Sequence, residues 1–110
     1  MPTYNKLVRD RIPFIISSQG KEYRTRILDP EEYTEELKVK LNEEVEEYIK
    51  ADNDQEALEE LADMLEVIRA LAEAHGSTWA ELENIRADKA ESRGSFQERV
   101  YLIDVDDDLE

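Results

Sequence analysis

Cysteine is absent from this chain of 110 residues, which excludes a disulfide framework and a thiolate metal site. Long hydrophobic runs are also missing, because no apolar stretch approaches the roughly 20 residues that cross a membrane as a helix. The N-terminal stretch MPTYNKLVRDRIP carries charges where a signal peptide needs apolar residues. These absences together predict a cytoplasmic protein that has no membrane partner.

Basic residues are scarce, since 14 lysines and arginines stand against 29 aspartates and glutamates, and the formal net charge is −15 at pH 7. A chain this negative repels nucleic acids and anionic membranes, so neither is expected as a partner. It attracts cations, and carboxylate-rich sites favour hard ions such as Mg²⁺, Mn²⁺ or Ca²⁺. Acidity alone is better explained as a means of staying soluble.

The chain has only three glycines and three prolines, and several of them mark the ends of predicted helices. Pro13 near the start and Gly20 past the end predict a short N-terminal helix in RIPFIISSQG. The segments YRTRILD and ERVYLIDV alternate polar and apolar residues, as short strands do. We expect them to form a minor two-stranded β element, which is marginal unless it packs on helices.

Capping residues predict three longer helices in succession. The N-caps are Asp29, Asn53 and Thr78, each with a glutamate three residues later, as in a capping box. The first helix is expected to run to about residue 51, while Gly76 and Gly94 end the second and third. The pattern predicts an all-α helical bundle in one domain over residues 1–105, followed by a flexible acidic tail over residues 106–110.

Several acids fall on the apolar sides of the first two long helices. At ~100° per residue, Glu44 lies inside the apolar arc of the first helix and Glu47 lies just off its edge. On the second helix, Glu60 lies inside the apolar arc and Asp63 lies at its border. Each pair is spaced i,i+3, which puts both side chains on one face. Two antiparallel helices joined by a short turn would bring the pairs together.

Carboxylates held against a core must be neutralised, paired or bound to metal. The basic residues on these two helices are Lys38, Lys40, Lys50 and Arg69. Such a small number favours a divalent cation as the neutralising group, although glutamate-rich helices also produce acidic pairs by chance. The predicted metal ligands are Glu44, Glu47, Glu60 and Asp63.

The stretch EEVEE followed by ELAD resembles the EExxE…ExxD signature of the MazG-like all-α nucleoside triphosphate pyrophosphatases. The segments YNKLVRDRIP and KAESRGSF resemble a short, single-domain, house-cleaning branch related to phosphoribosyl-ATP pyrophosphatase, and the likeness covers nearly the whole chain. The resemblance implies cleavage between the α- and β-phosphates with Mg²⁺, or Mn²⁺, on the same four acids. It implies that Glu43 binds a second ion or orients the attacking water.

Basic residues outside the acidic helices are candidates for phosphate contacts. Lys89 and Arg93 share a face of the third long helix, at spacing i,i+4. Lys6 and Arg9 either contact the substrate or form structural ion pairs with the acidic helices. One departure from the family pattern is Asp88, which stands before Lys89 where relatives often carry asparagine.

Self-association is expected, because three modest helices leave apolar arcs that one chain can hardly cover. A homodimer would complete a four-helix core, and the resemblance implies dimers or dimers of dimers. Two other functions remain open: a phosphoribosyl-ATP pyrophosphatase of histidine biosynthesis, and a non-catalytic acidic helical module that binds a partner. No motif indicates which base the protein would prefer.

Overall fold

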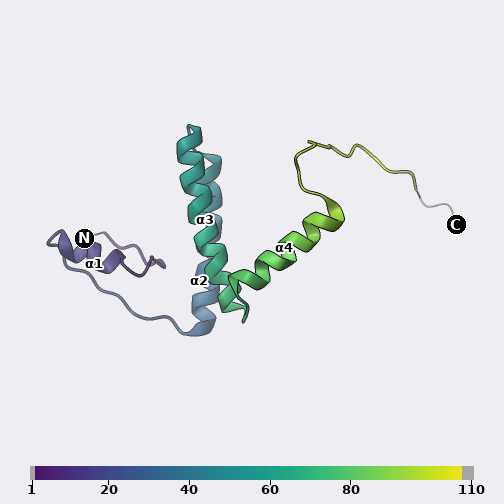
Figure 1. Ribbon diagram of the computed structural model, residues 1–110. Coiled ribbons are helices and arrows are strands. Elements are labelled where there is room, and N and C mark those ends of the chain that lie inside the picture. The colour runs from purple at the N-terminus through teal and green to yellow at the C-terminus, as the bar shows by residue number, and fades with distance from the viewer. Residues whose placement is uncertain (1, 108–110) are drawn as a thin grey trace. The chain divides into compact units, whose positions relative to one another are not determined.

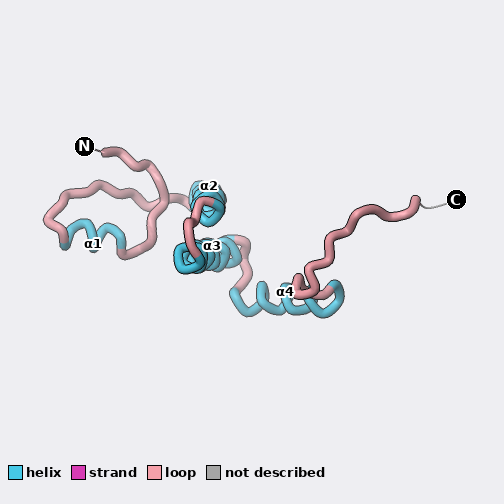
Figure 2. Tube along the Cα trace, turned by 90° about the horizontal axis from the view of Figure 1, so that it is seen from above, coloured by secondary structure: helices cyan, strands magenta, loops and turns pink. Residues whose placement is uncertain are grey.

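The computed structural model describes residues 2–107, and all regular structure within them is helical (Figure 2). The elements are α1 (Ile12–Ser18), α2 (Pro30–Ile49), α3 (Asp54–Ala74) and α4 (Trp79–Arg93). The all-α class predicted from the sequence is therefore confirmed. None of the described helices combines the length and the apolar character that a membrane crossing requires.

Side-chain caps explain where α2 and α3 begin. The backbone N–H of Glu32 donates to Asp29 Oδ1 at 2.9 Å, and the backbone N–H of Glu56 donates to Asn53 Oδ1 at 2.9 Å. A cap of this kind stabilises a helix by about 1 kcal/mol. Glu56 Oε2 in turn accepts from the backbone N–H of Asp52 at 3.0 Å, one residue before the cap itself. Both N-caps are as predicted, and α2 ends at Ile49, slightly earlier than expected.

A glycine ends α3 through a Schellman motif. Gly76 has a φ of +79°, in the left-handed region that lacks a steric penalty only for glycine. Its N–H donates to the carbonyl of Glu73 at 2.9 Å, and the N–H of Ser77 donates to the carbonyl of Ala72 at 2.9 Å. These two bonds satisfy carbonyl groups that the helix end would otherwise leave unpaired.

The predicted β element does not form in residues 2–107. Residues 23–29 and 98–105 have no regular secondary structure, although their sequences alternate as strands do. An alternating segment becomes a strand only when a neighbour completes its hydrogen-bond ladder, and an isolated two-stranded ribbon is marginal. Most of residues 98–105 remains exposed, including Val100, Tyr101 and Ile103.

α2 and α3 pack side by side as an antiparallel hairpin joined by residues 50–53 (Figure 1). The buried centre of the hairpin consists of Leu37 from α2 and of Val67 and Ala72 from α3. Much of the predicted apolar arc of α3 stays accessible, because Leu58 is 61% exposed and Leu65 is 52% exposed. The hairpin therefore has a small core and an uncovered apolar face.

The structure divides into two compact units, Met1–Trp79 and Ala80–Glu110. The first unit contains α1 and the α2–α3 hairpin, and the second contains nearly all of α4 together with the C-terminal segment. The single domain over residues 1–105 stays a prediction. Of the acidic tail predicted over residues 106–110, residues 108–110 lie outside the described part of the chain.

Candidate metal centre

Three carboxylates from two helices meet at the contact between α2 and α3. Glu44 and Glu47 of α2 and Glu60 of α3 each offer an oxygen atom, and these atoms lie within 4.8 Å of one another. The i,i+3 spacing places the two α2 residues on one side of that helix, and the hairpin brings α3 against that side. The structure thus brings together three of the four residues predicted as metal ligands.

Two of these carboxylates have oxygen atoms that are hidden from solvent and unpaired. Glu44 Oε2 and Glu60 Oε2 have no hydrogen-bond partner among the described residues. The side chain of Glu44 is only 12% exposed. A carboxylate oxygen in this position destabilises the protein unless a proton or a cation compensates it. These two oxygen atoms therefore lack a compensating partner among residues 2–107.

The electrostatics of the cluster are visible in the pKa of Glu60, which is raised above its ordinary value. Burial is the largest cause, because it removes water from the charged form. The proximity of the Glu44 carboxyl group and the negative charges of Glu47 and Asp63 raise the pKa further. A divalent cation at this position would act in the opposite direction by neutralising the charges.

Asp63, the fourth predicted ligand, lies outside the group of three. Arg9 Nη2 donates to Asp63 Oδ1 at 2.6 Å, which joins the N-terminal segment to α3. Both side chains of this pair are substantially exposed, at 56% for Arg9 and 41% for Asp63. Of the two roles left open for Arg9, the structure thus shows an ion pair with an acidic helix.

Glu43 and Glu44 share a lysine that was not assigned a role from the sequence. Lys40 Nζ lies 3.7 Å from Glu43 Oε2 and 4.0 Å from Glu44 Oε1. These separations are long, and neither buried oxygen of the cluster is satisfied by the lysine. The i,i+3 and i,i+4 spacings from Lys40 were the signal that could have revealed this contact. Lys40 therefore contributes positive charge beside the cluster without replacing a metal ion.

The other predicted phosphate-binding residues have no structural support as a site. Lys6 Nζ lies 6.0 Å from the centre of the Tyr4 ring, a weak cation–π contact. Lys89 and Arg93 are exposed on α4, and neither forms an ion pair within residues 2–107. Arg86, one turn before Lys89, donates to Glu83 on the same helix at 2.6 Å. Phosphate contacts by Lys6, Lys89 and Arg93 stay predictions.

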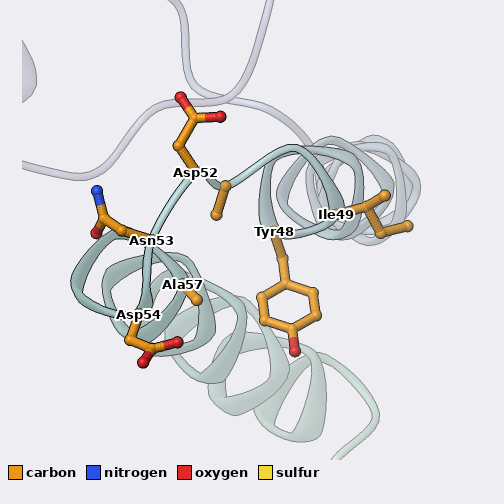
Figure 3. Close-up of a pocket in the computed structure, with 7 residues that line it drawn as sticks. Tyr48, Ile49, Asp52, Asn53, Asp54 and Ala57 are labelled. Carbon is orange, nitrogen blue, oxygen red and sulfur yellow. The ribbon is translucent and has the colours of Figure 1, made fainter.

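A pocket of about 290 Å³ lies at the turn between α2 and α3 (Figure 3). None of the three clustered carboxylates lines it. Its walls are formed by Tyr48, Ile49, Ala51, Asp52, Asn53, Asp54 and Ala57. Figure 3 shows Tyr48 extending from the end of α2 toward α3. Because the lining includes two aspartates and no basic residue, the pocket suits neither a phosphate nor another anion.

The three-carboxylate group fits a hard divalent cation. All its donors are oxygen atoms, as Mg²⁺ and Mn²⁺ prefer, and Glu44 and Glu60 each have one oxygen atom that is buried without a partner. Three side chains also leave room for the waters that Mg²⁺ normally retains. No protein-family model matches the chain, and neither a curated protein nor a solved structure matches it.

Proposed function

We propose that this protein is a Mg²⁺-dependent nucleoside triphosphate pyrophosphohydrolase, which cleaves the bond between the α- and β-phosphates and releases a nucleoside monophosphate and pyrophosphate. One observation carries the proposal: Glu44, Glu47 and Glu60 converge, and two of their oxygen atoms are buried without a partner. The EExxE…ExxD pattern and the resemblance to the MazG-like enzymes supply the reaction. Removal of non-canonical nucleotides is the proposed biological task.

Hydrolysis of a phosphoanhydride requires charge neutralisation, an activated water and a stabilised leaving group. Mg²⁺, when bound, neutralises phosphate oxygens and lowers the pKa of water. Glu44, Glu47 and Glu60 would hold the ion, because they present the required oxygen donors on two facing helices. Hydrophobic residues such as Leu37 hold α2 against α3 and so keep the carboxylates in place.

Glu43 is the proposed catalytic carboxylate. It precedes Glu44 on α2, it lies outside the group of three, and its side chain is 38% exposed. A partly exposed carboxylate beside an ion-binding group can orient a water molecule and accept its proton. Lys40 Nζ, at 3.7 Å from Glu43 Oε2, places positive charge beside this carboxylate.

A homodimer is proposed as the functional assembly, alone or as a dimer of dimers. Leu58, Leu61 and Leu65 follow one another at helical spacing on α3 and are all exposed. Two hairpins that pack through this face would bury it in a four-helix core. The dimer would also raise stability, since one hairpin buries only three hydrophobic side chains among the described residues.

A screen for pyrophosphate release tests the activity. The substrates are canonical and damaged nucleoside triphosphates, dUTP, dCTP and phosphoribosyl-ATP, each with Mg²⁺ and with a chelator. Release from nucleoside triphosphates with Mg²⁺ alone supports the proposal, whereas exclusive release from phosphoribosyl-ATP assigns the histidine-pathway reaction. Absence of turnover on every substrate would favour an acidic helical interaction module.

A further inference from the structure

Arg9 forms an ion pair with Asp63, a carboxylate next to the candidate metal centre. Asp63 follows Glu60 at spacing i,i+3, so both side chains project from the same face of α3. The negative charge of Asp63 reaches Glu60, because it contributes to the raised pKa of that residue. Asp63 nevertheless stands outside the group of three, and its Oδ1 accepts from Arg9 Nη2 at 2.6 Å. A side chain from the N-terminal segment thus neutralises the fourth acid.

The pair between Arg9 and Asp63 is easily exchanged. Both side chains are substantially exposed, and ion pairs of this kind contribute little net stability because water and salt compete with them. Residues 2–9 have no regular secondary structure. The Arg9 carbonyl accepts from the N–H of Ile12 at 3.0 Å, while the Arg9 side chain remains exposed. A divalent cation carries twice the charge of a guanidinium and prefers carboxylate oxygens. It can therefore compete with Arg9 for Asp63.

We propose that Arg9 is an exchangeable cation of the metal centre. Arg9 forms its ion pair with Asp63 while no metal is bound. When a divalent ion binds, Asp63 becomes one of its ligands and the ion pair breaks. The released guanidinium then contacts the phosphates of the substrate. This inference rests on the proposed function. Arg9 suits the second role because a guanidinium presents five N–H donors and can bind phosphate through two parallel hydrogen bonds.

The proposed exchange predicts that replacing Arg9 strengthens the binding of Mg²⁺ alone and weakens the binding of a nucleotide with Mg²⁺. Removal of the competing cation in Arg9→Gln should tighten binding of Mg²⁺ alone by about two- to fivefold, the range of a surface ion pair. The same variant should bind a non-hydrolysable nucleoside triphosphate analogue with Mg²⁺ about tenfold more weakly, because a charge-assisted hydrogen bond is lost. Arg9→Lys should retain competition for Asp63 but lose part of the phosphate binding.

Isothermal titration calorimetry at fixed ionic strength measures both affinities, with Arg11→Gln as the matched control. Arg11 lies two residues away and has the same charge, but its side chain has no ion pair within residues 2–107. Equal effects of the two substitutions on Mg²⁺ affinity would overturn the proposal, because they would show only a change in overall charge. Weaker Mg²⁺ binding by Arg9→Gln would also overturn it, since Arg9 would then support the ligands.

Hydrogen exchange supplies a readout that does not depend on turnover. Saturating Mg²⁺ should accelerate amide exchange in residues 5–11 of the wild-type protein, and Asp63→Asn should show that faster exchange without Mg²⁺. Unchanged exchange on Mg²⁺ binding would refute the release of Arg9 while leaving the metal centre intact. Failure of the wild-type protein to bind Mg²⁺ at all would overturn both this inference and the proposed function.

Discussion

Glu44 of α2 and Glu60 of α3 approach each other across the hairpin, and each leaves one buried oxygen without a hydrogen-bond partner. Two carboxylates in this relationship repel each other when both are ionised. The repulsion is maintained by the packing of the two helices, which holds the side chains together. We therefore expect the repulsion to lower the stability of the metal-free protein, and binding of a cation between the two carboxylates to raise it.

Glu60→Gln should stabilise the metal-free protein at neutral pH, because it removes a poorly hydrated charge and its repulsion by Glu44 and Glu47. The melting temperature should rise by a few degrees in thermal unfolding followed by circular dichroism. Glu46→Gln, at an exposed position of α2, is the control and should have little effect. A lower melting temperature for Glu60→Gln would show that Glu60 is a satisfied structural acid.

The stability difference between Glu60→Gln and the wild type should depend on pH with a definite sign. The pKa of Glu60 is raised in the folded protein above its ordinary value of 4.5. The folded state then binds a proton more readily than the unfolded state, so stability increases as pH falls through the folded pKa. The advantage of Glu60→Gln should be full above that pKa and vanish as pH approaches 4.5. Melting curves of both proteins from pH 8 to pH 4.5 measure it.

Mg²⁺ should raise the melting temperature well beyond the effect of NaCl at equal ionic strength. Binding at one hundred times the dissociation constant stabilises a protein by about 2.7 kcal/mol. Glu44→Gln and Glu47→Gln should each reduce the effect strongly, because each replaces a negatively charged carboxylate of the group with a neutral amide, which is a weaker ligand for Mg²⁺. A response no larger than that to NaCl would support the acidic interaction module.

Glu43→Gln should lower kcat by about 10²- to 10⁴-fold while Mg²⁺ affinity stays near the wild-type value, as expected for loss of a general base. Steady-state pyrophosphate release gives kcat, and calorimetry gives the affinity. The distinction follows from the position of Glu43 outside the group of three carboxylates. If Mg²⁺ binding were lost together with turnover, Glu43 would be a ligand of the ion.

Leu65→Glu should convert the proposed dimer to a monomer, because it places a charge on the exposed apolar face of α3. Light scattering coupled to size-exclusion chromatography measures the change in mass. Val39→Glu is the matched control, since Val39 is also exposed but lies on a different face of α2 from Leu37. A wild-type monomer, or a Leu65→Glu dimer, would contradict the proposed interface.

The helices were predictable because their signals are local. Asp29 and Asn53 cap residues three positions away, and Gly76 terminates α3 through bonds within one turn. The group of three carboxylates was largely predictable for a related reason. Helical periodicity fixes the face on which each carboxylate lies, and a connection of only four residues favours antiparallel packing of the two helices.

An ion pair between Arg9 and the acidic helices was one of two alternatives, but its partner, Asp63, could not be derived in the same way. Its two residues are 54 positions apart, and periodicity within a helix says nothing about where an irregular N-terminal segment lies. The segments 23–29 and 98–105 failed as strands for a similar reason, because a strand depends on a partner and not on its own alternation. Non-local contacts therefore set the limit of prediction in both cases.

Glu56 forms two hydrogen bonds with the connection between the hairpin helices. Its N–H donates to Asn53 Oδ1, and its carboxylate accepts from the N–H of Asp52. Glu60 lies four positions after Glu56, about one helical turn along α3. Because these two bonds fix where α3 begins, we expect them to influence the position of Glu60 along α3 relative to Glu44. Substitutions in this connection are expected to alter the spacing of the oxygen donors, and with it the size of ion that the proposed metal centre would accept, although all three carboxylates stay in place.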